Sequence, residues 1–132
     1  LAAVFARPER ERISALRRRI LIGAPASAKV LQSYHAGACR DADKIGRAFA
    51  EQRMLDIAYV NEARVRSARI VEPHFLYLSA PAWYLLAWDH LRGAVRVFRF
   101  DRIAKAEPLA RSFRLRSATM FLEAAEAGVE GV

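Results

Sequence analysis

The sequence predicts an α+β fold in which helices come first, strands follow, and one helix closes the chain. The apolar residues recur at helical spacing up to about residue 53 and alternate with other residues in the segments after it. Several short apolar segments then follow at close spacing, separated by turns, which is typical of a strongly bent sheet or a small barrel. Hydrophobic residues make up 54% of the 132 residues, so the chain can fill the core of a domain.

Three helices are predicted ahead of the strands, over residues 8–22, 27–35 and 41–53. Pro8 suits the first turn of the first helix, where its missing N–H costs no hydrogen bond. Ile13, Leu16 and Ile20 mark one face of that helix at helical spacing. Asp41 is the expected N-cap of the third helix. We expect the first two helices to form a linker or a dimerisation segment, because the apolar face of the first has to be buried somewhere.

The rest of the chain is predicted to form strands over residues 54–60, 64–72, 75–78, 82–88, 95–100 and 103–107, with a closing helix over 117–127. Leu55, Ile57 and Tyr59 alternate with smaller or polar residues, as in a strand with one buried face. The fourth segment is apolar on both faces, which indicates a central strand. Pro73 is expected to interrupt one strand and Pro108 to end the last one.

Positive charge is concentrated in the part of the chain that also holds most of the aromatic residues. The net charge is +8, and 19 of the 22 basic residues are arginine. Residues 64–116 contain eleven basic and four acidic residues. Arginines beside aromatic rings can hold phosphates and stack on bases, so this pattern indicates contact with nucleic acid or nucleotides. A second basic stripe, formed by Arg7, Arg10, Arg17 and Arg18, is either a phosphate-contacting surface or the solvated back of an amphipathic helix.

Several function classes are not expected for this sequence. Cys39 is the only cysteine, which argues against a disulfide framework and a cysteine-rich zinc site. His35, His74 and His90 lack metal-ligand spacing, and neither a nucleophile elbow nor a glycine-rich phosphate loop is present. The longest apolar run, residues 80–88, is shorter than the roughly 20 residues that cross a bilayer. The sequence therefore predicts a cytoplasmic protein that is not an enzyme, carries no cofactor or metal, and does not bind a membrane.

An ordered set of short motifs lies between residues 57 and 103. It consists of Ile57-x-Tyr59, Val71-Glu72-Pro73, Trp83-Tyr84-Leu85, an Arg-Gly hairpin, and Arg-x-Phe-Arg-x-Asp-Arg-Ile from Arg96 to Ile103. In this order the set resembles the WYL domain proteins, and the resemblance covers roughly residues 41–116. Residues 1–40 resemble, more loosely, the helical segment that joins the DNA-binding part to the WYL part in that family. Residues 117–132 are expected to form a C-terminal helix and tail.

The resemblance implies a five-stranded, Sm-like (SH3-related) barrel. It also implies the ligand-sensing part of a bacterial transcription regulator, whose winged helix-turn-helix binds promoter DNA. For some members the ligand is single-stranded DNA or another nucleotide-containing molecule. Residues 1–40 contain no convincing winged helix-turn-helix, so contact with duplex DNA is expected only through a segment outside this chain.

The residues expected to bind the ligand follow from the same resemblance. Arg99 and Arg102 would line a pocket or groove for phosphate. Further contacts are expected from Arg96, Tyr84, Tyr59, Arg69 and His74. The alternative is that the arginines are ion-paired, with Asp101, Glu72 or Asp89 as the carboxylate partner. Trp83 and Leu85 are expected to fill the barrel.

The sequence thus predicts an effector domain that binds a nucleotide or a single-stranded nucleic acid and forms a homodimer. Two alternatives stay open. One is a structural oligomerisation module whose arginines are ion-paired, and the other is a non-specific RNA or single-strand binder, by analogy with Sm-like barrels.

Overall fold

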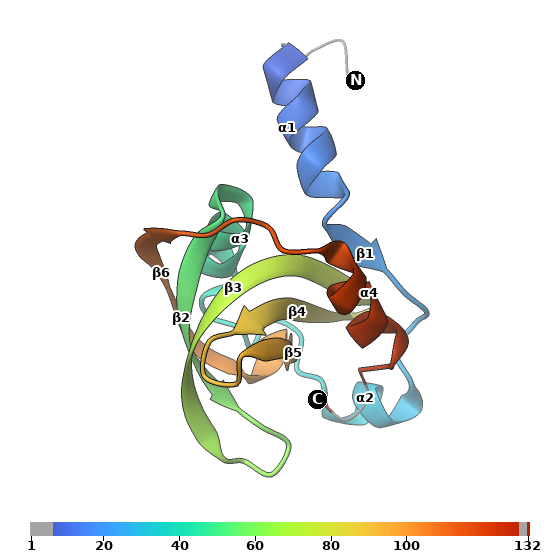
Figure 1. Cartoon of the computed structure of the whole chain (residues 1–132). Coiled ribbons are helices and arrows are strands. Elements are labelled where there is room, and N and C mark those ends of the chain that lie inside the picture. The colour runs from blue at the N-terminus through green and yellow to red at the C-terminus, as the bar shows by residue number, and fades with distance from the viewer. Residues whose placement is uncertain (1–6, 130–131) are drawn as a thin grey trace.

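A computed structural model describes residues 7–129 and 132, which fold into four helices and one six-stranded sheet (Figure 1). The helices are α1 (Arg7–Arg17), α2 (Ala28–Ser33), α3 (Ala42–Glu51) and α4 (Ala118–Glu126). The strands are β1 (Ile20–Ile22), β2 (Arg53–Val60), β3 (Arg66–Ser79), β4 (Ala82–Asp89), β5 (Ala94–Arg99) and β6 (Ile103–Ser112). A short 3-10 helix, η2 (Phe100–Arg102), joins β5 to β6. The predicted α+β class is confirmed.

The sheet is built around the long strand β3. The main strand order is β5-β4-β3-β2-β6, with antiparallel neighbours, and β1 pairs with β3 in parallel. The first half of β3 pairs with β2 and the second half with β4, so the sheet curls along this strand (Figure 1). Among the described residues no backbone pairing joins β5 to β6, so the sheet is not closed and the expected barrel is not confirmed. The expected count of five strands is wrong, because β1 adds a sixth.

The predicted first helix is too long at its C-terminal end. Ile20, expected on the apolar face of the helix, lies in β1 and pairs with β3. The reason is a tertiary contact, because the Arg19 side chain donates hydrogen bonds to the carbonyls of Pro73 and His74, both at 2.9 Å. These carbonyls lie on β3 beyond its pairing with β2, and buried carbonyls need a donor. Arg19 therefore fixes the chain against β3, and the next residues extend as a strand.

Pro73 was expected to interrupt one strand and Pro108 to end another, but both lie inside strands that continue beyond them; the pairing of β3 with β4 shifts register just after Pro73. Pro73 lies inside β3 opposite Ala87, beyond the residues of β3 that pair with β2, so its missing N–H costs no ladder hydrogen bond on that side. Pro108 lies opposite Leu55 in β6, an edge strand of the sheet, and β6 continues to Ser112. Edge positions tolerate proline because one side of the strand needs no N–H donor.

Two layers of buried side chains pack against opposite faces of β4. The first, which includes side chains of α3, comprises Ile45, Ala48, Leu55, Ile57, Tyr59, Val71, Leu85, Ala87, Phe98, Ile103 and Ala106. The second, which includes side chains of α2 and α4, comprises Val30, Phe75, Ala82, Tyr84, Leu86, Phe121 and Val129. Leu85 is buried as predicted. The prediction for Trp83 is wrong, since this residue is only half-buried and belongs to neither layer; it lies near the start of β4, beside the turn that precedes the strand.

Asp41 occupies the N-cap position of α3, as predicted, but its side chain does not cap the helix. The carboxylate instead accepts a hydrogen bond from the backbone N–H of Ala106 at 2.9 Å. That hydrogen bond lowers the pKa of Asp41. The residue therefore ties the start of α3 to the edge strand β6.

Candidate ligand-binding pocket

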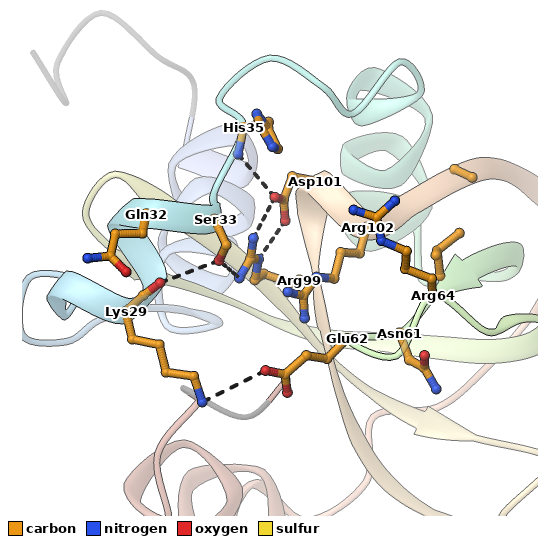
Figure 2. Close-up of a pocket in the computed structure, with 12 residues that line it drawn as sticks. Lys29, Gln32, Ser33, His35, Asn61, Glu62, Arg64, Arg99, Asp101 and Arg102 are labelled. Atoms are coloured by element: carbon orange, nitrogen blue, oxygen red, sulfur yellow. Dashed lines mark hydrogen bonds and ion pairs between the residues drawn. The ribbon is translucent and has the colours of Figure 1, made fainter.

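A pocket of about 820 Å³ opens at the end of the β2–β3 hairpin (Figure 2). Its walls come from three segments that are far apart in the sequence, namely α2 with the residues after it, the β2–β3 turn, and η2 with its neighbours. The polar lining residues are Lys29, Gln32, Ser33, His35, Asn61, Glu62, Arg64, Arg99, Asp101 and Arg102. The two arginines expected to hold phosphate, Arg99 and Arg102, thus lie in the same pocket.

Arg99 is ion-paired at the inner side of this pocket. Its side chain is 2% exposed, and the guanidinium donates two hydrogen bonds to Asp101, at 2.6 and 2.7 Å. A third hydrogen bond goes to Ser33 Oγ at 3.0 Å. The pairing raises the pKa of Arg99. Burial by itself raises the pKa of Asp101, but the hydrogen bonds from Arg99 and from the His35 backbone N–H, together with the charges of Arg99 and Arg102, outweigh burial and lower it. The alternative of an arginine–carboxylate pair is therefore confirmed for Arg99, with Asp101 as its partner.

The Arg99–Asp101 pair also holds the α2 segment in place. The backbone N–H of His35 donates to Asp101 Oδ2 at 3.1 Å (Figure 2). The Arg99 guanidinium also lies over the Tyr34 ring at 5.4 Å. On the other side, the Arg99 backbone N–H donates to Tyr59 Oη at 3.0 Å. One buried ion pair thus fixes α2, β2 and η2 relative to each other.

Arg64 and Arg102 are the lining arginines that make no ion pair with an acidic side chain among the described residues. Arg102 donates a hydrogen bond to the Val132 carbonyl. The remaining pair of opposite charges, Lys29 and Glu62, is 3.8 Å apart and exposed. Because the two lining carboxylates already have cationic partners, the pocket has an excess of positive charge.

Tyr59, Arg96 and Arg69 lie beside this pocket and do not line it. Tyr59 and Arg96 line an adjoining hollow of about 440 Å³, which shares Asn61 and Glu62 with the pocket. Tyr59, Arg96 and Arg69 line a third hollow of about 360 Å³. Arg96 is exposed, whereas Arg69 is ion-paired with a buried carboxylate, that of Asp89.

Tyr84 and His74 are not brought to the pocket, contrary to the expectation of one shared site. Tyr84 is fully buried in the second layer, and its hydroxyl has no hydrogen-bond partner among the described residues. The ring of His74 is 1% exposed and stacks on Phe121 at 4.3 Å, while its Nε2 lies 3.1 Å from Glu72. The sequence pattern does not reveal that α2 and α4 cover the face of the sheet that carries these two side chains.

The structure adds lining residues that the sequence did not indicate. Lys29, Ser33 and His35 come from a segment that was expected to be a linker, and no local pattern connects them to Arg99. Arg64 follows the β2 strand in the turn and has a left-handed backbone with φ of 64°. A positively charged residue at a hairpin turn is too common on protein surfaces to be singled out from sequence.

The described residues contain no group of three histidine, cysteine or acidic side chains suited to a metal ion. No helix in the same residues has the length and apolar character needed to span a membrane.

Comparison with known proteins identifies the family. Residues 40–108 match the WYL domain family, which is more than half of the chain. No curated protein matches. Among solved structures, the chain is similar to proteasome accessory factor B/C (PafBC) of Arthrobacter aurescens, with 30% sequence identity and a TM-score of 0.55. The match covers 65% of this chain and only 13% of the PafBC chain. The chain belongs to the WYL domain family.

Proposed function

We propose that this chain is the ligand-sensing domain of a bacterial transcription regulator, and that its pocket binds a phosphate-bearing effector, either a nucleotide or a single-stranded nucleic acid. Membership of the WYL domain family supports the regulatory role. The observation that carries the ligand class is the pair Arg64 and Arg102, which line the pocket without an ion pair in the described residues. Unpaired guanidinium groups in a hollow favour phosphate, which they can grip through two parallel hydrogen bonds.

The size and charge of the pocket agree with this ligand class. Its volume of about 820 Å³ lies within the range of roughly 300–1,000 Å³ found for small-molecule sites. Arg99 has a different part in this proposal: it is buried and donates three hydrogen bonds to Asp101 and Ser33, so it holds the wall of the pocket instead of gripping the phosphate. A ligand that contacts Ser33 or His35 would act directly on α2.

The test is a binding titration of the full chain with a 5′-labelled 12-base single strand and with labelled ATP, each at 50 and 200 mM salt. We expect the R64A/R102A variant to bind the single strand at least tenfold more weakly, with a salt slope smaller by about 1.4, because each single-strand phosphate contact contributes roughly 0.7 to that slope. The matched control is R47A/K105A, which removes two exposed positive charges that do not line the pocket.

Three results would contradict the proposal. They are no binding of either probe at 50 mM salt, binding without salt dependence, and equal binding by R64A/R102A and the control variant.

A second function, an oligomerisation module, is favoured by α1. This helix has no buried residue and extends away from the sheet (Figure 1), and Ile13 on it is 37% exposed. An apolar helix face of this kind is stabilised when a second copy covers it. A dimer in sedimentation equilibrium, together with unchanged nucleic-acid binding by R64A/R102A, would favour this function over ligand sensing.

A further inference from the structure

A second basic hollow, of about 430 Å³, lies at the other end of β2 and β6. It is lined by the end of β6, by the strap (residues 113–116) that leads to α4, and by Met54 and His90. Figure 1 shows the strap crossing from β6 to α4 over the sheet. The ligand pocket includes Val60 and this hollow includes Met54, so the two are about 20 Å apart along β2.

The strap has a fixed course although it is not part of the sheet. The Phe113 backbone N–H donates to the Gln52 carbonyl at 3.0 Å, and Gln52 Nε2 donates to the Phe113 carbonyl at 3.1 Å. The Phe113 ring packs against the His74 ring at 5.0 Å. A segment held in this way presents its outward side chains at little further entropic cost when a partner binds.

The carboxylate in this hollow is already neutralised. Glu72 is 5% exposed and accepts hydrogen bonds from Arg116, His74 and His90. Arg116 donates to both of its oxygens, at 2.8 and 3.1 Å. Arg111 and Arg114 are exposed and, within the described residues, make no ion pair. Two uncompensated guanidinium groups therefore lie on a fixed piece of backbone.

We propose that Arg111 and Arg114 bind the phosphodiester backbone of a nucleic acid, at a site separate from the ligand pocket. Arginine forks match phosphate oxygens, and the net charge of +8 attracts a polyanion to the molecule. Phe113 is half-buried against His74, and the His90 ring is held by its hydrogen bond to Glu72, so neither ring that lines the hollow is free for a base to stack on. Contact with phosphates alone does not depend on base sequence, so a duplex suffices as the partner.

The experiment measures binding of the full chain to a labelled 20-base-pair duplex of arbitrary sequence at 50 and 200 mM salt. We expect R111A/R114A to bind about tenfold more weakly at 50 mM salt, with a salt slope smaller by about 1.8, since each duplex phosphate contact contributes roughly 0.9. R47A/K105A, with the same loss of charge elsewhere, should change binding much less. R64A/R102A should keep duplex binding, which separates this site from the ligand pocket.

Two results would overturn the proposal. One is a loss of duplex binding in R111A/R114A no larger than in R47A/K105A. The other is tighter binding of a labelled poly-glutamate peptide than of the duplex, together with loss of that peptide binding in R111A/R114A. This result would identify an acidic protein as the partner. Thermal melting of each variant checks that the fold is retained. Failure of the single-strand experiment on R64A/R102A leaves this proposal standing, because the duplex measurement is independent of it.

Discussion

At each of the two ends of β2 and β6 a buried carboxylate is held by an arginine, but the other partners of the two carboxylates differ. At one end, beside the ligand pocket, the buried carboxylate of Asp101 pairs with a guanidinium, that of Arg99. At the other end the buried carboxylate of Glu72 is held by Arg116 and by two histidines. Each ion pair fixes a connecting segment to the sheet, and each leaves neighbouring arginines unpaired. Among the described residues, histidine rings hydrogen-bond the buried carboxylate only at the second end.

This difference teaches that two arginines of one motif can have different roles. Within the motif from Arg96 to Ile103, Arg99 is ion-paired with its neighbour Asp101. Arg102, three positions later, lines the pocket and makes no ion pair with an acidic side chain among the described residues. We therefore expect Arg99 to govern stability and Arg102 to govern binding.

The largest expected effect comes from breaking the first ion pair. Arg99→Ala leaves the carboxylate of Asp101 buried without its cation, which costs about 3–5 kcal/mol in the free energy of unfolding. Urea denaturation measures it, and Arg102→Ala serves as the control with a smaller change of about 1 kcal/mol, because it removes only the hydrogen bond to the Val132 carbonyl. Equal stabilities of the two variants would remove the distinction between the two arginines.

A smaller effect is expected from removal of the Tyr59 hydroxyl, which accepts a hydrogen bond from the Arg99 backbone N–H. Tyr59→Phe removes the acceptor of the Arg99 backbone N–H and leaves that buried donor unpaired, at a cost of about 1–3 kcal/mol. Tyr84→Phe is the matched control, because the Tyr84 hydroxyl has no hydrogen-bond partner among the described residues. We expect the control to be neutral or slightly stabilising in the same denaturation assay. A larger cost for Tyr84→Phe than for Tyr59→Phe would contradict the assignment.

The smallest expected effect is a pH dependence of the free energy of unfolding, caused by the buried His74 at the second end. Burial lowers the pKa of His74 below its ordinary value of 6.5, with the hydrogen bond to Glu72 opposing it. The unfolded chain then takes up a proton that the folded chain does not, so the free energy of unfolding falls as the pH drops below 6.5. Urea denaturation at pH 8, 6.5 and 5.5 measures this loss. His74→Gln should abolish it, and a wild-type stability that is flat over this range would refute the prediction.

Glu72 adds a second, more acidic stage to the same titration. Burial by itself raises the pKa of Glu72, but hydrogen bonds from the arginine and the two histidines outweigh it and lower the pKa to about 2. The stabilisation by Glu72 is therefore complete above pH 4.5 and is lost as the pH falls from 4.5 towards 2. This stage should persist in His74→Gln, which separates the two groups.

Much of the fold was predictable from local patterns. The alternation of Leu55, Ile57 and Tyr59 predicted a half-buried strand, and β2 buries all three. The helix over 41–53 and the closing helix were predicted within a few residues of α3 and α4. The errors fall where a distant contact decides the local structure, as at Arg19, which fixes the chain against β3 and makes Ile20 part of a strand.

The site was predictable only in part, for the same reason. The motif drew attention to Arg99 and Arg102, and both line the pocket. Tyr84 and Leu85 are neighbours on an apolar strand, and the alternation of their faces was evident, but not that helices cover both faces. Burial of Tyr84 follows from helices that lie far from it in the sequence.

The sequence by itself determined the α3 and α4 helices and strand β2, which depend on local periodicity, and the arginine-rich character of the chain, which is a matter of composition. It also indicated the WYL domain family, through an ordered set of motifs. Only the tertiary structure decided which arginines are free. An ion pair forms between groups that the fold brings within hydrogen-bond distance, and the contacts of Ser33 with Arg99 and of His35 with Asp101 each span 66 residues. Charge that is paired in this way stabilises the fold, and the charge left over is what remains for binding.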